Sequence, residues 1–274
     1  MRNEPGATEE GQFSSFSDPE KHALVSEIIR RHSTRAEDVR DVALEGLDLS
    51  FARNVLDLGC GFGFMAEAVA RRCAPDAELT GVEACESNER PFLERVAAAG
   101  RRGRFLPGCI DDRLDWPDRS LDFVVASYSL YFFPRLVPEI ARVLAPHGLF
   151  LAVTHTEESC KDLLRAAGLP AADARLLGSV REFSAENGGS LLAPWFGHVE
   201  RVDYRNALVF EPEDLGDFAT YLDFKLRLIP PGSRPREGLP GPVAGSTTPG
   251  TARRERVVFS KDDAIFRCGE PRRP

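Results

Sequence analysis

The chain has 274 residues, 42% of them hydrophobic, which is enough to bury the core of one large α/β domain. It carries 35 Lys and Arg residues against 43 Asp and Glu residues, so its net charge is −8, and a nucleic-acid backbone is not expected as the main partner. The first residues are polar and acidic, unlike a signal peptide, and no apolar run reaches the roughly 18 residues of a membrane span, which argues against a membrane partner.

The cysteines indicate a reducing, cytoplasmic setting. No two of them form a Cys-x-x-Cys pair, and no histidine stands near them at the spacing of zinc ligands, so we expect no metal site. We interpret all six as small buried apolar side chains, at positions Cys60, Cys73, Cys85, Cys109, Cys160 and Cys268.

The N-terminal region is predicted to be a flexible tail followed by helices. Residues 1–18 are polar, and Phe16 is either an anchor that folds over a ligand or an apolar side chain in a loose tail. The Ser-Asp-Pro-Glu segment at 17–20 combines capping residues, a proline and an acid, which is typical of a helix start. Apolar spacing then predicts a helix over 19–32, and a second short helix is expected over 34–45.

Short apolar runs alternate with helical segments over the next hundred residues. Such alternation is typical of a parallel sheet that is covered by helices on both faces, so the expected fold class is α/β. The predicted strands are 55–58, 79–82, 104–106, 121–126 and 149–154, and the predicted helices are 65–72, 91–99 and 134–144.

After residue 155 the pattern is mixed. The proline- and glycine-rich stretch 230–252 is predicted to be a long surface loop, and the segment 260–263 to be a hairpin turn between the last two strands. The other expected elements are helices over 157–167, 181–193 and 213–226 and strands over 198–204, 207–210, 256–259 and 264–268.

A glycine-rich loop follows the first strand of this pattern. Residues 55–64 read VLDLGCGFGF, and glycines allow the backbone to turn sharply and approach a ligand at the start of a helix. A dinucleotide site usually needs Gly-x-Gly-x-x-Gly, but Phe64 occupies the position of the third glycine. Asp57 beside the loop would repel a pyrophosphate and suit a cationic ligand. Glu83, which ends the next strand, is placed to accept hydrogen bonds from a ribose diol.

This ordered set of features resembles the class I S-adenosylmethionine-dependent methyltransferases. The glycine loop with Asp57 is similar to their first motif, and Cys109–Ser127 is similar to the stretch that leads into their fourth strand. Ala141–His155 is similar to the helix, turn and strand that follow. The resemblance covers roughly residues 50–155.

The resemblance implies a Rossmann-like sheet, mostly parallel with an antiparallel C-terminal strand, and helices on both faces. It also implies S-adenosylmethionine as cofactor and S-adenosylhomocysteine as product. Relatives usually carry Asp where this chain has Cys109 or Ile110, so either the side chain of Asp111 or the amide of Ile110 is expected to meet the adenine. The implied cofactor residues are Asp57, Gly59, Cys60, Gly61, Gly63, Phe64, Glu83, Ala84, Ile110, Asp111 and Ser127.

Ligands of open α/β sheets bind beyond the carboxyl ends of the strands. His155 follows the fifth strand and is the candidate general base, and Tyr131 is a second catalytic candidate, although either residue could be purely structural. Methyl transfer depends mainly on proximity and orientation, so a base is needed only if the acceptor holds its proton tightly. The expected substrate contacts are Phe16, Tyr128, Tyr131, His155 and Trp195.

We expect methyl transfer to an oxygen, nitrogen or carbon atom of a small molecule. The segments 1–45 and 157–197 are expected to close over it and exclude water. The alternatives are a scaffold that binds the cofactor without catalysis and a nicotinamide-dependent oxidoreductase. The oligomeric state is left open. The predicted organisation is a tail (1–18) and one domain (19–274) with a helical cap (19–48), a cofactor-binding core (50–155) and a substrate-side part (156–274).

Overall fold

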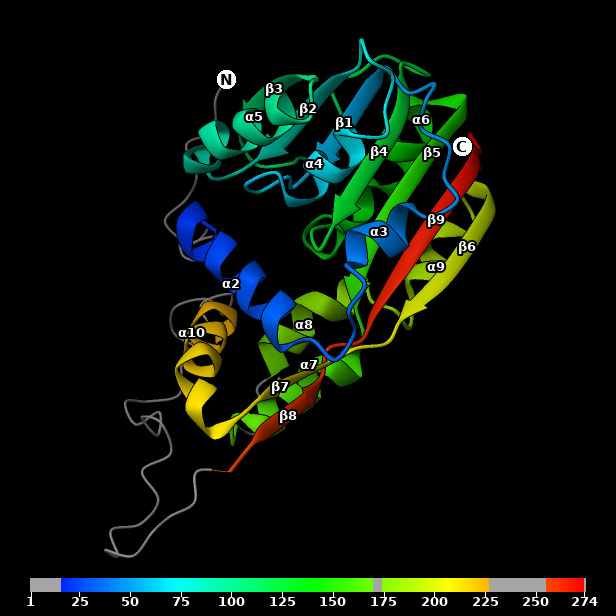
Figure 1. Cartoon of the computed structure of the whole chain (residues 1–274). Helices are drawn as coiled ribbons and strands as arrows, with labels where there is room; N and C mark the ends of the chain where they lie inside the picture. The colour runs from blue at the N-terminus through cyan, green and yellow to red at the C-terminus, as the bar shows by residue number, and fades with distance from the viewer. Residues whose placement is uncertain (1–15, 170–173, 227–254, 274) are drawn as a thin grey trace, which may run out of the picture.

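The computed structural model describes residues 16–169, 174–226 and 255–273. Its main sheet is built from β1 (Asn54–Leu58), β2 (Glu78–Glu83), β3 (Arg102–Pro107), β4 (Leu121–Ser127), β5 (Leu144–His155), β6 (Phe196–Tyr204) and β9 (Asp263–Pro271). The strand order is β3-β2-β1-β4-β5-β9-β6, and β9 runs antiparallel to both of its neighbours (Figure 1). The prediction of a mostly parallel sheet with an antiparallel C-terminal strand is therefore confirmed.

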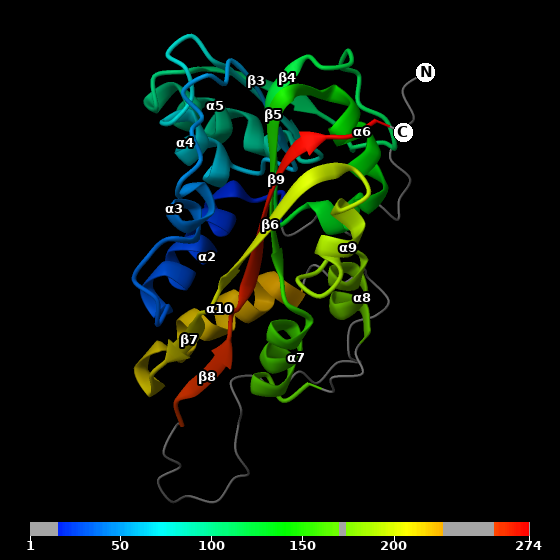
Figure 2. The ribbon, with the colours of Figure 1, turned by 90° about the vertical axis from the view of Figure 1, so that its right-hand side faces the viewer.

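Each face of this sheet packs against its own set of helices. Alternation along β4 sends Phe123 and Val125 to one face and Val124 and Ala126 to the other, and all four are fully buried. Figure 2 shows helices on both sides of the sheet, as predicted. They are α3 (Val39–Leu44), α4 (Phe64–Ala70) and α5 (Glu89–Ala98) on one side, and α6 (Val137–Val143), α8 (Ala174–Glu182) and α9 (Gly188–Leu192) on the other.

A smaller layer lies beyond the carboxyl ends of the parallel strands. It comprises the long helix α2 (Pro19–His32), the helices α7 (Glu157–Ala166) and α10 (Leu215–Leu226), and the two-stranded ribbon of β7 (Ala207–Phe210) and β8 (Val257–Ser260). In Figure 1, α2 and α10 lie side by side, and ion pairs of 2.6 Å (Lys21–Asp223) and 2.7 Å (Arg31–Asp217) join them. The described residues also form four short 3₁₀ turns, at Glu86–Asn88, Leu130–Phe132, Pro134–Leu136 and Pro212–Asp214.

This layer has a hydrophobic cluster of its own. The insertion between β6 and β9, residues 205–262, supplies most of its side chains, and α2 and α7 supply the others. Because apolar burial stabilises by about 25 cal/mol per Å², the cluster helps to hold the described parts of the insertion against α2 and α7. Its buried members are Val25, Ile28, Leu163, Leu208, Phe210, Tyr221, Phe224 and Phe259.

Helix α2 begins at the capping residue and proline that the sequence indicates. The side chain of Asp18 accepts a hydrogen bond from the amide of Lys21 at 2.9 Å, and Pro19 is the first helical residue. The predicted helix over 19–32 is confirmed. Within the described ranges, no helix is both long and apolar enough to span a bilayer.

Two expectations about the second half of the chain are wrong. The helix expected over 181–193 is split into α8 and α9, because the side chain of Asn187 bonds the amide of Ser184 (2.7 Å) and the carbonyl of Arg181 (2.6 Å) in place of a helical turn. The hairpin expected at 260–263 does not form, since β8 pairs with β7 while β9 pairs with β5 and β6. The tail before Phe16 and the predicted loop 230–252 lie outside the described residues.

Candidate functional site

A cavity of about 340 Å³ opens where β1, β2, β4 and β5 end. The glycine loop and the strand ends form its floor, and α2 and α10 form its roof. Most of the predicted site residues line this cavity, namely Phe16, Asp57, Gly59, Cys60, Gly61, Phe64, Glu83, Ala84, Ile110, Ser127, Tyr128, Tyr131 and His155. The predicted residues that do not line it are Gly63, Asp111 and Trp195.

The glycine loop needs glycine for two different reasons. Gly59, Gly61 and Gly63 all have positive φ, at 71°, 49° and 88°, which side chains other than glycine rarely adopt. Gly63 precedes α4 and packs on the Phe92 backbone, so it shapes the loop without facing the cavity. A Cβ on Gly59 would lie 2.5 Å from the Cβ of Ser129, so this position also needs the space.

We expect Gly59→Ala to lower the free energy of unfolding by about 2–5 kcal/mol, because a left-handed backbone and a steric clash both oppose the new methyl group. Gly46 has the same φ of 72° but open space around its missing Cβ. Gly46→Ala is therefore the matched control and should cost only about 1 kcal/mol. Urea denaturation measures both values, and equal losses in the two variants would show that the contact with Ser129 is unimportant.

Asp57 is buried at the end of β1 without a partner. Neither carboxylate oxygen has a hydrogen-bond partner among the described residues. Burial, with a smaller contribution from the charge on Glu83, raises the pKa of Asp57 to about 8. A buried acid that protein groups leave unsatisfied, and that faces a cavity, is suited to a cationic ligand.

Glu83 is held rigidly at the end of β2. Its Oε2 accepts a hydrogen bond from the amide of Gly61 at 3.0 Å, and its Oε1 accepts one from the amide of Cys85 at 3.0 Å. Burial raises its pKa even though these two bonds favour the charged form. Each oxygen retains a lone pair for a further donor, so the side chain fixes the glycine loop and still offers two acceptors to the cavity.

The far end of the cavity has Ile110 and Cys109 in its wall. Asp111 is exposed and does not line the cavity, so the structure does not bring this carboxylate to the site. The reason is local, because the residues from Asp111 to Arg113 form an exposed turn that leaves the sheet. Of the two residues expected to meet the adenine, Ile110 lines the cavity and Asp111 does not.

Trp195, which the sequence predicted as a substrate contact, does not line the cavity. Trp195 directly precedes β6, which begins at the edge of the sheet where the parallel strands begin. β6 reaches the opposite edge, where the parallel strands end, only at Tyr204, which pairs with Asp263 beside His155. Trp195 packs there against the hydrophobic cluster that α6 and α9 share. Its sequence position after 155 suggested a substrate contact, but the strand direction removes it from the cavity.

Asp263 organises the side chains at the end of the cavity where β5 ends. Its Oδ1 lies 2.7 Å from Nδ1 of His155, and its Oδ2 accepts bonds from the hydroxyl of Tyr128 at 2.8 Å and from Nζ of Lys261 at 2.6 Å. Burial alone would raise the pKa of Asp263, but Lys261 and His155 lower it to about 2. The aspartate is therefore ionised and fixes the orientation of three side chains.

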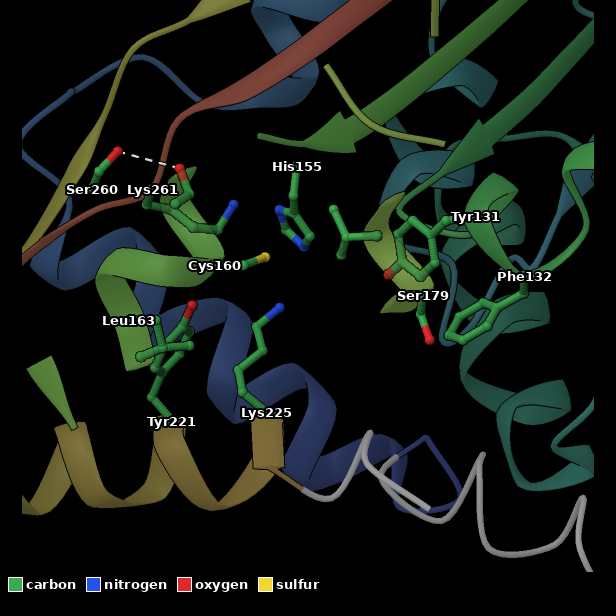
Figure 3. A pocket seen from close by; sticks show the side chains of 12 residues that line it. Tyr131, Phe132, His155, Cys160, Leu163, Ser179, Tyr221, Lys225, Ser260 and Lys261 are labelled. Carbon is green, nitrogen blue, oxygen red and sulfur yellow. Dashed lines mark hydrogen bonds between the residues drawn. The ribbon is translucent and has the colours of Figure 1, made fainter. Parts of the chain in front are cut away.

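His155 is neutral in this setting. Burial, together with the charges of Lys261 and Lys225, lowers its pKa to about 4 in spite of the bond to Asp263. Because Asp263 binds Nδ1, Nε2 is the nitrogen that remains to accept a proton. Figure 3 shows the imidazole between Lys261 and Tyr131, and burial raises the pKa of Tyr131, which keeps that phenol protonated.

Several residues at the site were not predicted from the sequence. His22 of α2 lines the cavity next to Gly61 and stacks on Phe224. Lys225 comes from α10, and Lys261 from the segment that was expected to be a hairpin turn. Long-range contacts bring these residues to the cavity: the pairing of β9 with β5 places Lys261, and the packing of α2 against α10 places His22 and Lys225.

The model of a methyltransferase domain family matches residues 55–148. A protein of Micromonospora griseorubida named for 23S rRNA (guanine-N(1)-) methylation is 32% identical over 178 residues, which are 64% of this chain and 56% of that protein. A trans-aconitate 2-methyltransferase of Variovorax paradoxus is 29% identical over 181 residues, covering 63% of this chain and 64% of the relative. This chain thus spans about three fifths of the length of these relatives.

Solved structures agree on the fold. An S-adenosylmethionine-dependent methyltransferase of Thermotoga maritima superposes with a TM-score of 0.50 at 15% identity, over 94% of this chain and 99% of that one. Identity at this level supports the fold alone. Together with the strand order and the glycine loop, the family match shows a methyltransferase domain of the class I fold over residues 55–148, a kind of domain whose cofactor is S-adenosylmethionine.

Proposed function

We propose that this protein transfers a methyl group from S-adenosylmethionine to an oxygen, nitrogen or carbon atom of a small molecule. The observation that carries the proposal is Asp57, a buried acid without a hydrogen-bond partner among the described residues, at the floor of a cavity of about 340 Å³. S-Adenosylmethionine carries two cationic groups, a sulfonium and an ammonium, which an unpartnered carboxylate would attract. When bound, it supplies an electrophilic methyl group.

The chain's own residues would bind and orient the reactants. The glycine loop and Asp57 would hold the amino-acid end, Glu83 the ribose hydroxyls, and Ile110 the base. On the acceptor side, Nε2 of His155 would accept a proton from an acceptor that carries one. Phe16, Tyr128 and Tyr131 would form the walls, so catalysis would rest mainly on proximity and on the exclusion of water.

A small acceptor is favoured because α2 and α10 cover the cavity and restrict the size of the molecule that can enter it.

We also propose one domain over 19–274, with a cap (19–48), a cofactor-binding core (50–155) and a substrate-side part (156–274). The cytoplasmic setting stays a prediction from the cysteines. The absence of a nucleic-acid partner stays a prediction from the net charge of −8, and one relative named for rRNA methylation makes RNA the substrate to test against.

Calorimetric titration with S-adenosylmethionine, S-adenosylhomocysteine and NADH tests the cofactor. We expect micromolar binding of both sulfur nucleotides and none of NADH. Glu83→Ala should weaken this binding roughly 30-fold or more, since each hydrogen bond to a charged group contributes about 1.5–3 kcal/mol. Glu78→Ala, at the opposite end of the same strand, is the matched control and should bind like the wild type.

NADH is included in the titration to test the alternative of a nicotinamide-dependent oxidoreductase. Tyr221 and Lys225 on α10 have the Tyr-x-x-x-Lys spacing that many such enzymes use. Tight binding of NADH, or no binding of either sulfur nucleotide to the folded protein, would contradict the proposal. Tight cofactor binding without turnover across a broad panel of small molecules and an RNA would favour the non-catalytic scaffold.

A further inference from the structure

A second, smaller cavity adjoins the acceptor side of the first. It has a volume of about 30 Å³, enough for about two water molecules or one carboxylate group. Figure 3 shows its walls, with side chains from α7, α8 and α10 pointing toward one space. It shares five lining residues with the larger cavity, namely Tyr131, Phe132, His155, Lys225 and Lys261.

Two lysines reach this shared wall, and only one of them is neutralised. Nζ of Lys261 lies 2.6 Å from Asp263. Lys225 forms no hydrogen bond or ion pair with any residue that the structure describes, and the ring of Tyr221, 5.9 Å from its Nζ, is the aromatic group it faces. Figure 3 shows the amine of Lys225 pointing from α10 into the space below His155.

Among the described residues at this wall, the charge balance is therefore positive. Asp263 carries one negative charge and already binds Lys261, and His155 is neutral. Burial and the nearby charge of Lys261 lower the pKa of Lys225 to about 8, so the amine is still mostly protonated at pH 7. A partly buried cation without a counter-ion is costly unless a ligand supplies the opposite charge.

We propose that the acceptor molecule is a small organic acid whose carboxylate binds Lys225 in the smaller cavity. This inference rests on the proposed function and specifies its substrate class. A monovalent carboxylate matches both the single unneutralised cation and the volume of about 30 Å³. The hydrocarbon body would extend past Tyr131 and Phe132, which line both cavities, into the larger cavity toward the methyl donor.

The test uses the full chain saturated with S-adenosylhomocysteine. Acetate, benzoate and trans-cinnamate are titrated beside their neutral primary amides, which have the same shape without the charge. We expect at least one acid to bind about tenfold or more tightly than its amide. Lys225→Met should abolish this preference by weakening the acid about tenfold, and Lys225→Arg should retain most of it.

Two controls distinguish a failure of the carboxylate site from a failure of the proposed methyl-transfer function. Lys161→Met removes a partly exposed lysine of α7 that pairs with Glu158 and does not line either cavity, and it should leave acid binding unchanged. All variants should bind S-adenosylhomocysteine with the same affinity. If the wild type does not bind S-adenosylhomocysteine, the proposed function is contradicted, and not the assignment of a carboxylate to Lys225. If no acid binds more tightly than its amide, or if Lys225→Met binds the acids as well as the wild type, the assignment of a carboxylate to Lys225 is wrong.

The stability of the ligand-free protein gives a second measurement. Lys225→Met should raise the melting temperature, because it removes a charge that repels Lys261 and has no partner among the described residues. A fall in melting temperature would mean that the amine of Lys225 stabilises the fold, and the reasoning from an unneutralised cation would fail.

Discussion

Replacing Asp57 by asparagine is expected to weaken the binding of S-adenosylmethionine roughly 100-fold while stabilising the ligand-free protein. Removing one member of a buried charge pair typically costs about 2–5 kcal/mol of binding free energy. In the ligand-free protein the same carboxylate has no hydrogen bond to lose, since neither oxygen has a partner among the described residues. We therefore expect the free energy of unfolding to rise by about 2–4 kcal/mol at pH 7.

The pH dependence provides a signature of the same group. The pKa of Asp57 is raised to about 8 in the folded protein, so its contribution to stability is fully present below about pH 4 and is lost as the pH rises toward 8. The advantage of Asp57→Asn should thus be small at pH 4 and large at pH 8. Conversely, cofactor affinity in the wild type should increase over the same interval, because the bound cation requires the ionised form.

Asp122 provides a matched control for this substitution. It lies on β4 at the other edge of the sheet, where its Oδ2 accepts hydrogen bonds from the amides of Arg53 and Asn54, both at 2.9 Å. Asp122→Ala should therefore lower stability and leave cofactor affinity unchanged. Chemical denaturation and calorimetry measure the two quantities, and a loss of stability in Asp57→Asn would contradict the view that this acid is reserved for a ligand.

The second large effect concerns the carboxylate that His155, Tyr128 and Lys261 share. Asp263→Asn should lower the free energy of unfolding by about 3–5 kcal/mol, because it leaves the ammonium group of Lys261 buried without a counter-charge. The side chains of Lys261 and Asp263 are only 8% and 1% exposed, so water cannot replace the lost partner. Urea denaturation of the ligand-free protein measures this effect without knowledge of the acceptor.

A double variant identifies the cause of this loss. Adding Lys261→Met to Asp263→Asn removes the uncompensated charge, so the double variant should recover a large part of the lost stability. If the double variant is as unstable as Asp263→Asn alone, the aspartate stabilises the fold through His155 and Tyr128 and not through the ion pair.

The central sheet and the cofactor end of the cavity were predictable because their signals are local. Apolar runs mark β1, which glycine ends, and β2, and the acid near the end of each strand, Asp57 and Glu83, reaches the cavity because parallel strands end at one edge. The spacing of three glycines also located the loop, although Gly63 serves the start of α4 and not the cavity.

The acceptor end could not be predicted in the same way, because long-range pairing creates it. The antiparallel insertion of β9 between β5 and β6 places Asp263 opposite His155, and no pattern near residue 263 indicates this partner. The same pairing moves Trp195 to the opposite edge of the sheet. His22 was missed for a related reason, since only the packing of α2 against α10 carries it over the glycine loop.

The separate hydrophobic cluster of the 205–262 insertion has an evolutionary consequence. Lys225 and Lys261 reach the cavity from a segment whose buried side chains pack mainly among themselves and against α2 and α7, while two other clusters hold the sheet. Mutations in this segment can therefore change which molecule is accepted without loosening the strands that hold the cofactor. Under the proposed function, new specificities would arise by changes within this one insertion, while the strands that carry Asp57 and Glu83 keep their structure.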